Sequence, residues 1–322
     1  MPPVEPTVIF EDGWLLAIDK PAGMLAHAEG TTHSALAWAQ AREAKAQRDP
    51  VFLHLVHRLD RQTSGVLLFA RGKAIAEAVN ALFRDRKVLK MYVALCSPVP
   101  TVRWLKVDQL LKPERIGSGE RMQVVAEGGI EASCEIEVLA RGRRFAVVRV
   151  IPDQGRKHQV RVALAASGSP IAGDFLYGGA LSRQLAPRVM LHARSLQFSH
   201  PHTQEHLILF AALPSDLKKL VADDGGTLPT NLDARHRAPV AKHGRAPLLA
   251  LPKINNLAGA AALPQPRSYA RAKPAGGQPS PSKPEQAPSK PEQAPSKPEQ
   301  APSKPEQAPS KPEQARSKLP KK

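Results

Sequence analysis

The amino-acid sequence predicts an α+β fold: a mixed, mainly antiparallel β-sheet core with flanking helices, followed by a disordered basic tail. Short apolar runs of strand length are joined by tight turns, as at residues 11–13 and 140–144. Residues 73–86 instead repeat their apolar side chains at the spacing of an amphipathic helix. Beyond residue 224 the sequence becomes rich in proline and lysine, which is typical of a chain without a core.

Composition divides the 322-residue chain into a folded domain, predicted over residues 1–224, and a tail over residues 225–322. The tail carries 17 Lys and Arg against 6 Asp and Glu, and it holds 19 of the 32 prolines. Because it has few large apolar side chains, it cannot bury enough surface to offset the entropy lost on ordering. We therefore expect the tail to be disordered.

The tail ends in five copies of Ser-Lys-Pro-Glu-Gln-Ala between Ser282 and Ala315, with a period of seven residues. Such a period is typical of coiled coils, but each copy contains proline and none offers an apolar pair at the a and d positions. The sequence thus predicts an extended low-complexity arm that is accessory to the folded domain.

The chain has a formal net charge of +17, which favours an acidic polymer as partner. Charge alone fits either nucleic acid or an anionic membrane surface. The sequence has no apolar run long enough to cross a membrane, which takes about 18 residues. Acidic side chains at positions 5, 11, 12 and 19 exclude a secretory signal. We expect a cytoplasmic protein that does not contact membranes.

Cysteine and histidine give little support for a metal site. Cys96 and Cys134 are the two cysteines, and they lack the Cys-x-x-Cys spacing of a thiolate site. His200, His202 and His206 form a His-x-His-x3-His cluster, but this segment lies between two strand-like runs. A hairpin loop explains its polar residues without a metal, since no second acidic or thiolate ligand is nearby in the sequence.

The first elements are a hairpin and a helix. Residues 8–10 and 14–19 predict two strands joined by a turn that contains glycine. The second strand ends at Lys20, which a Pro-Ala-Gly turn would hold at the strand end. Residues 34–46 predict a surface helix with Ser34 as the N-cap.

The later elements follow from the same patterns. Residues 73–86 predict a helix, and residues 88–96 predict a strand. Between residues 97 and 132, prolines and glycines interrupt the apolar pattern, and we expect loops and short edge strands there. Residues 134–139 and 145–151 predict a second hairpin with a basic turn.

The segment from His57 to Gly65 places charged and turn-forming residues between the apolar runs 53–56 and 66–70. Thr-Ser-Gly at its end predicts a tight connection, so Asp60 should lie on a turn beside a sheet. Taken alone, Arg-x-Asp is more typical of a capped turn with a surface ion pair. The alternative is that partial desolvation gives Arg58 and Asp60 a partner or a task.

A second charged stretch, residues 153–162, follows a strand-like run and opens a predicted helix that ends before Gly168. Helical spacing puts His158 and Arg161 on one face, together with apolar side chains. A guanidinium directed toward apolar neighbours needs a carboxylate partner. The helix therefore predicts an ion pair with another part of the chain.

The segment from His57 to Gly65 resembles the active-site motif of the RluA-type pseudouridine synthases, in which Arg-Leu-Asp carries the catalytic aspartate and Thr-Ser-Gly follows. The resemblance implies that Asp60 is catalytic and that Arg58 fills the space left by a base extruded from structured RNA. Lys-Pro-Ala-Gly at residues 20–23 is similar to the first signature of this family, although such a lysine taken alone is typically solvated.

Two further signatures imply substrate-binding residues. Lys-x-Tyr at residues 90–92 is where the family keeps a tyrosine that packs on the target base, although a lone strand tyrosine is usually a core or rim aromatic. Gly-Arg-x-His-Gln-x-Arg at residues 155–161 resembles the third signature, whose final arginine pairs with the catalytic aspartate. The resemblance thus assigns Tyr92 to the base, Val160 to the pocket floor, and Arg161 to Asp60.

The resemblance covers residues 8–220 and implies the pseudouridine synthase catalytic fold. It implies an isomerase that converts specific uridines in structured ribosomal or transfer RNA, without a metal or organic cofactor. No N-terminal S4-like domain is apparent, and we expect a monomer. The sequence departs from the pattern at Ala163 and Ser169, where the family commonly has histidine.

Two other functions fit part of the sequence. A noncatalytic RNA-binding or ribosome-assembly protein would explain the charge and the basic tail, but it leaves the Arg and Asp pairing without a purpose. A hydrolase with an aspartate nucleophile would need a second carboxylate or a histidine partner at suitable spacing, which the sequence does not offer.

Overall fold

A computed structural model describes residues 4–27, 33–46, 52–117, 119–230 and 232. The tail was predicted to begin at residue 225. From residue 233 onward, which includes all of its repeats, it lies outside the described residues. The domain boundary predicted after residue 224 stays a prediction.

The described chain forms an eleven-stranded sheet flanked by helices. Its strands are β1 (Thr7–Glu11), β2 (Leu15–Lys20), β3 (Leu53–Leu55), β4 (Ser64–Arg71), β5 (Leu89–Cys96), β6 (Trp104–Ile116), β7 (Gly119–Val125), β8 (Ile130–Arg141), β9 (Ala146–Pro152), β10 (Leu191–Ser199) and β11 (His206–Phe210). Its helices are α1 (Ala35–Lys45), α2 (Lys73–Arg84), α3 (Gln159–Ala166), α4 (Phe175–Leu185) and α5 (Ser215–Asp223).

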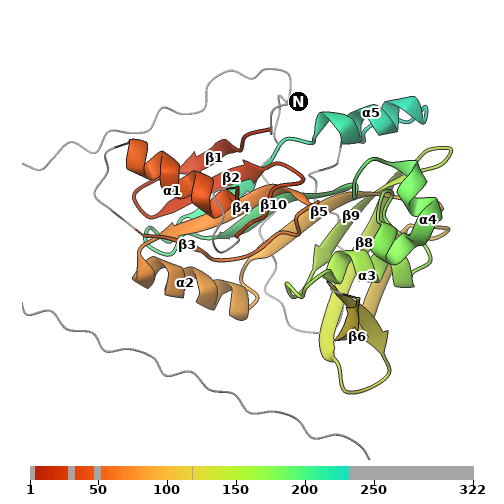
Figure 1. Ribbon diagram of the computed structural model, residues 1–322, viewed down its shortest axis with the longest axis horizontal. Coiled ribbons are helices and arrows are strands. Elements are labelled where there is room, and N and C mark those ends of the chain that lie inside the picture. The colour runs from red at the N-terminus through yellow and green to blue at the C-terminus, as the bar shows by residue number, and fades with distance from the viewer. Residues whose placement is uncertain (1–3, 28–32, 47–51, 118, 231, 233–322) are drawn as a thin grey trace, which may run out of the picture. The chain divides into compact units, whose positions relative to one another are not determined.

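The strand order is β1-β2-β4-β10-β5-β9-β8-β6-β7, with β3 paired to β4 and β11 paired to β10. Figure 1 shows α1 and α2 beside the end of the sheet that holds β1 to β4, and α3 and α4 beside the end that holds β8 and β9. Among the described strands, β4 and β10 form the parallel pair, and the other pairs are antiparallel. The predicted mixed, mainly antiparallel α+β fold is confirmed.

Strand β2 is buried on both faces of the sheet. Leu15 packs in a cluster that includes Val79 of α2, whereas Leu16 packs in a cluster that includes Ala39 of α1. Successive side chains of a strand point to opposite faces, so helices on both sides require apolar residues at every position. This requirement explains the continuous apolar run at residues 15–18.

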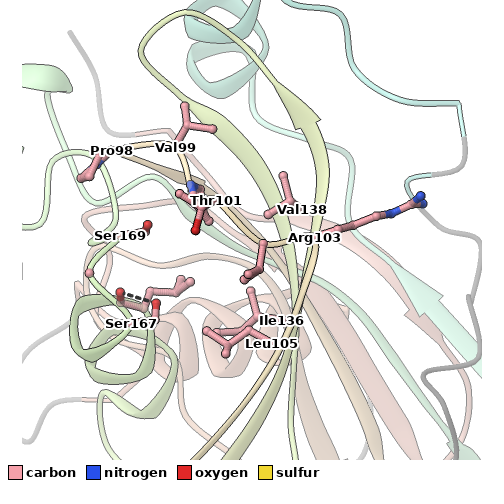
Figure 2. A pocket seen from close by; sticks show the side chains of 13 residues that line it. Pro98, Val99, Thr101, Arg103, Leu105, Ile136, Val138, Ser167 and Ser169 are labelled. Carbon is pink, nitrogen blue, oxygen red and sulfur yellow. Dashed lines mark hydrogen bonds between the residues drawn. The ribbon is translucent and has the colours of Figure 1, made fainter.

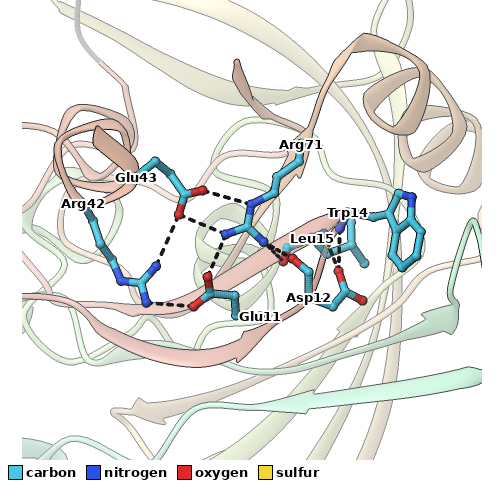
Figure 3. Close-up of polar contacts among 7 residues, drawn as sticks. All are labelled: Glu11, Asp12, Trp14, Leu15, Arg42, Glu43 and Arg71. Carbon is cyan, nitrogen blue, oxygen red and sulfur yellow. Dashed lines mark hydrogen bonds and ion pairs between the residues drawn. The ribbon is translucent and has the colours of Figure 1, made fainter. Parts of the chain in front are cut away.

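Buried charges tie the first hairpin and α1 to β4, as Figure 3 shows. Arg71 at the end of β4 donates hydrogen bonds to Glu43 of α1 at 2.9 and 3.0 Å and to Glu11 of β1 at 2.9 Å. It also donates to the carbonyl of Leu15 at 3.1 Å. Arg42 contacts the second oxygen of Glu11 at 2.7 Å and Glu43 at 3.3 Å, so each of the two carboxylates is shared by two guanidinium groups.

The parallel junction of β4 and β10 depends on the Ser64-Gly65 step. Gly65 faces Ala193 with a φ of 116°, and a Cβ at this position would lie 2.2 Å from the Ala193 carbonyl oxygen. Beside it, the Ser64 hydroxyl lies 3.0 Å from Nδ1 of His192. The glycine is therefore required by the close approach of two backbones.

The hairpins and helices predicted by periodicity are present. Residues 8–19 form β1 and β2, residues 134–151 lie in β8 and β9, and the histidine-rich segment connects β10 to β11. Helix α1 begins after Ser34, whose hydroxyl accepts the Ala37 N–H at 3.2 Å. These elements form where local spacing and capping agree with the tertiary packing.

The prediction of loops and short edge strands between residues 97 and 132 was wrong. This segment contains the 13-residue strand β6, all of β7, and the start of β8. Pro113 is tolerated in β6 because it lies where β6 pairs only with β7, opposite Met122. A strand that is paired on one side has no second ladder for the missing N–H to break.

The packed chain continues past residue 224. The buried carboxylate of Asp224 accepts backbone N–H groups of Arg144 at 2.9 Å and of Phe145 at 3.1 Å. Leu228 and Leu232 pack against the core cluster around β5, β8 and β9. The basic turn between β8 and β9 is thus held by the segment that follows α5.

We predict that Gly65→Ala destabilises the protein by more than about 3 kcal/mol, because the strained φ and the contact with the Ala193 backbone both oppose a Cβ. Urea denaturation of the two proteins would measure the difference. Gly13→Ala is a matched control, since nothing lies within 4 Å of its Cβ. Equal stability of the two variants would contradict the role of Gly65 at the junction.

Candidate active site

Asp60 lies on the turn between β3 and β4, and backbone hydrogen bonds hold this turn in place. The Thr63 N–H donates to the Asp60 carbonyl at 3.0 Å. The next residue, Arg61, accepts the Gly23 N–H at 2.7 Å and returns a side-chain hydrogen bond to the Gly23 carbonyl at 3.0 Å. The Pro-Ala-Gly turn after β2 is therefore joined directly to the turn that carries Asp60.

Lys20 is a buried cation that joins the same two turns. Its side chain is fully buried, and Nζ donates to the carbonyls of Pro21 at 2.9 Å, Met24 at 2.8 Å and Arg61 at 3.3 Å. Burial lowers the pKa of Lys20 to about 7, while the charge of Asp60 opposes this shift. Lys20 is thus part of the frame of the site, unlike the solvated lysine that this turn sequence typically carries.

Arg161 on α3 bridges two carboxylates. Its Nη1 lies 3.2 Å from Oδ2 of Asp60, so the helix carries the ion pair that its sequence predicts. Its Nε and Nη2 donate to the two oxygens of Asp174 at 2.7 and 2.8 Å. Burial opposes the charged form of Arg161, but the hydrogen bonds and charge of Asp174, joined by those of Asp60, raise its pKa above the ordinary value.

His158 and Tyr177 complete the wall beside Asp60. His158 precedes α3 with a φ of 55°, so the predicted placement of this residue inside the helix was wrong. Its Nδ1 lies 2.7 Å from the Tyr177 hydroxyl, and its Nε2 lies 3.8 Å from Oδ1 of Asp60. The Tyr177 ring lies beneath the guanidinium of Arg161, 5.0 Å from its Cζ.

The five residues assigned from the sequence line one small cavity of about 70 Å³: Arg58, Asp60, Tyr92, Val160 and Arg161. They come from the turn before β4, from β5 and from α3. Burial raises the pKa of Tyr92, so its phenol stays protonated and neutral near pH 7. The structure thus brings these residues together, and their roles in the reaction stay predictions.

A larger cavity of about 200 Å³ lies at the other end of α3, as Figure 2 shows. Its walls are mainly apolar, with Leu105, Ile136, Val138 and Leu164 among them. Arg103 is the one titratable side chain among its lining residues, and in Figure 2 it extends away from the others. Because the lining of this cavity has no carboxylate, histidine, lysine, cysteine or tyrosine side chain, we assign the site to the smaller cavity.

Three features of the site were not predicted from the sequence. Asp174 is the N-cap of α4 and Tyr177 lies in its first turn, and the sequence analysis did not identify this helix. Gln154 lines the cavity, and its Oε1 accepts hydrogen bonds from the Ser133 N–H at 2.8 Å and from Gln159 at 3.2 Å. One signal in the sequence could have found α4: Asp174 is a residue type that commonly caps helices. In the structure its side chain accepts the Tyr177 N–H.

In the histidine cluster at residues 200–206, His200 and His202 contact protein side chains. His200 Nε2 lies 3.0 Å from Oδ2 of Asp12, and His202 stacks on Trp14 with 3.9 Å between the ring centroids. Within the part of the chain that the structure describes, no group of three or more His, Cys, Asp or Glu side chains could hold a metal ion. The described helices are all too short or too polar to cross a membrane.

Comparison with known proteins finds relatives that match about two thirds of the chain. The family model for RNA pseudouridylate synthase matches residues 15–166. The chain is 34% identical over 224 residues to the ribosomal large subunit pseudouridine synthase C of Pasteurella multocida, covering 68% of each chain. It is 31% identical to the tRNA pseudouridine synthase C of Vibrio parahaemolyticus, covering 68% of this chain and 95% of that one.

A solved structure, human RNA pseudouridylate synthase domain containing 4, has the same fold. The two superpose with a TM-score of 0.58 at 26% identity, over 69% of this chain and 94% of the human chain.

We predict that Asp174→Asn destabilises the protein by about 3 to 5 kcal/mol, because it removes the charge that compensates a buried guanidinium. Thermal unfolding would measure this loss. Asp216→Asn is a matched control: Asp216 also binds an arginine through two hydrogen bonds, but its side chain is 40% exposed. We expect the control to lose no more than about 1 kcal/mol. A similar loss in both variants would show that burial of the Arg161 pair does not matter.

Proposed function

The chain belongs to the RNA pseudouridylate synthase family, and we propose that it isomerises specific uridines in structured ribosomal or transfer RNA with Asp60 as the catalytic residue. The ion pair between Asp60 and Arg161, at 3.2 Å on the wall of the cavity, is the observation that carries this proposal. A paired carboxylate that remains open to a cavity is available for chemistry, unlike the enclosed carboxylate of Asp174.

The reaction cuts the glycosidic bond of uridine, turns the detached uracil, and joins it again through carbon. Asp60 would act on the ribosyl group as nucleophile or base, and its negative charge is stabilised by Arg161. Because Asp174 binds the other edge of the guanidinium, Arg161 keeps its position when Asp60 reacts. The charge that faces the reacting carboxylate is therefore in place before substrate binds.

Tyr92 and Val160 would hold the uracil while it is detached. Both line the cavity next to Asp60, on β5 and α3 respectively. Stacking of a base on an aromatic ring contributes about 1 to 3 kcal/mol. This retention would keep the base from being lost while its bond to the sugar is broken.

Arg58 would stabilise the RNA after the target base leaves the helix. Its residue is exposed at the cavity, two positions before Asp60. Extrusion of a base costs about a few kcal/mol, and a side chain that fills the vacated space offsets part of this cost. The exposed position of Arg58 is suited to this role.

The names of the relatives support both classes of RNA, since one relative acts on the ribosomal large subunit and another on tRNA. We also propose that the enzyme works in the cytoplasm as a monomer, without a metal or organic cofactor. The residues proposed for the reaction all come from one chain, which supports a site that needs no second subunit.

We predict that Asp60→Asn lowers kcat by more than about a thousandfold and retains RNA binding. The variant should fold, because Arg161 keeps Asp174 as a partner. Tritium release from RNA that contains 5-tritiated uridine would measure turnover, and Asp85→Asn on the surface is the control. A normal rate in the Asn variant would refute Asp60 as the catalytic residue. Binding without tritium release by the wild-type protein would instead indicate a noncatalytic RNA-binding protein.

We predict that removal of residues 233–322 leaves kcat on short RNA substrates unchanged, because the cavity is built from residues 58–191. The shortened chain keeps Leu228 and Leu232, which pack on the core. The tritium-release assay on the two chains would test this. A large fall in kcat, with unchanged thermal stability, would contradict an accessory role of the tail.

A further inference from the structure

His158 adopts a backbone conformation that is uncommon for a residue with a side chain. Its φ of 55° lies in the left-handed region, directly before α3. Residues in this region cost about 1 kcal/mol or more, and they persist where surrounding contacts hold them. Here the conformation places an imidazole between the Tyr177 hydroxyl and Asp60, with 12% of the side chain exposed.

The contacts of Tyr177 favour one of the two neutral tautomers of His158. The phenolic oxygen accepts the backbone N–H of Met122 at 2.9 Å. The hydroxyl has one proton of its own to donate, and Nδ1 of His158 lies 2.7 Å away. With the hydroxyl donating to Nδ1, the neutral imidazole carries its proton on Nε2. That nitrogen is the one that faces Asp60.

The surroundings of His158 favour the neutral imidazole. Burial lowers its pKa below the ordinary value, and the charges of Arg161 and Lys157 act in the same direction. Asp60 and Asp174 oppose this shift but do not reverse it. The nearby Glu120 is engaged by Lys157 at 2.7 Å.

We propose that His158 is a positioning residue for Asp60: its Nε2–H donates to Oδ1 when substrate is bound, Arg161 donates to Oδ2, and Tyr177 selects the required tautomer. This inference rests on the proposed function of Asp60. The present separation of 3.8 Å is longer than a hydrogen bond, and catalytic hydrogen bonds are often long without substrate and tighten when substrate binds. A carboxylate held at both oxygens keeps one orientation toward the ribose.

The arrangement also excludes a different role for His158. A neutral imidazole with its proton on Nε2 cannot accept a proton on the side that faces the cavity. Its other nitrogen is occupied by Tyr177. His158 therefore orients the carboxylate and does not act as the general base.

The tautomer can be measured without activity. In the full chain labelled with ¹⁵N, long-range ¹H–¹⁵N correlation spectra at pH 7 should show His158 with protonated Nε2 and unprotonated Nδ1. Tyr177→Phe keeps the ring beneath Arg161 but removes the hydroxyl, so its spectrum should show a mixture of tautomers. A proton on Nδ1 in the wild-type protein would overturn the proposal, as would an unchanged spectrum in the Phe variant.

Kinetics of two His158 variants test the donor itself. His158→Gln places an amide N–H near the position of Nε2, whereas His158→Met has no donor. We expect the Met variant to lose roughly 10- to 100-fold in kcat, the range for one hydrogen bond to a charged group, and the Gln variant to lose less. His206→Gln, at an exposed position of β11, is the control for histidine replacement. Equal kcat values in the Gln and Met variants would overturn the proposal.

The two experiments separate this inference from the proposed function. If the wild-type protein released no tritium, the proposed function would fail while the NMR measurement still reported the tautomer of His158. If Asp60→Asn abolished turnover and His158→Met did not lower it, Asp60 would stand as the catalytic residue and the role of His158 would be refuted.

Discussion

The guanidinium of Arg161 lies between two carboxylates from distant parts of the chain, Asp60 and Asp174. Loss of the fully buried partner, Asp174, would cost about 3 to 5 kcal/mol, so α3 has to meet the start of α4, and the turn before β4 brings Asp60 to the same guanidinium. Asp174 takes two donors and leaves Nη1 for the cavity. One contact thereby stabilises the fold and supplies the charge that faces the proposed catalytic residue.

Two contacts that the proposed reaction does not use hold the turn that carries Asp60. After the turn, Gly65 allows β4 to pair with β10, because a Cβ at this position would overlap the Ala193 carbonyl. Within the turn, the Arg61 carbonyl accepts a hydrogen bond from the buried side chain of Lys20. The segment from His57 to Gly65 therefore combines the proposed catalytic carboxylate with the glycine that the parallel pairing of β4 and β10 requires.

Local patterns predicted the elements whose side chains repeat with the packing. The helix at residues 73–86 could be recognised because its apolar period matches the face that it buries. The hairpin at residues 8–19 could be recognised because two short strand-like runs are joined by a turn that contains glycine. Strand β6 was missed because it contains Pro113 with charged residues around it. These residues are tolerated where β6 pairs with β7 alone, and the sequence does not show that pairing. Helix α4 was missed because Gly179, with a φ of 68°, interrupts its pattern.

The sequence by itself predicted the fold class and, through its resemblance to a known family, five residues of the cavity, including Arg58, Tyr92 and Val160. The apolar patterns that predict the fold class, and the motifs that carry the resemblance, each lie within a single segment of the chain. Tertiary structure alone decided that Asp174 anchors Arg161 and that Tyr177 orients His158. Such partners meet within about 3 Å only after separate segments pack, and no local pattern specifies which segment supplies them.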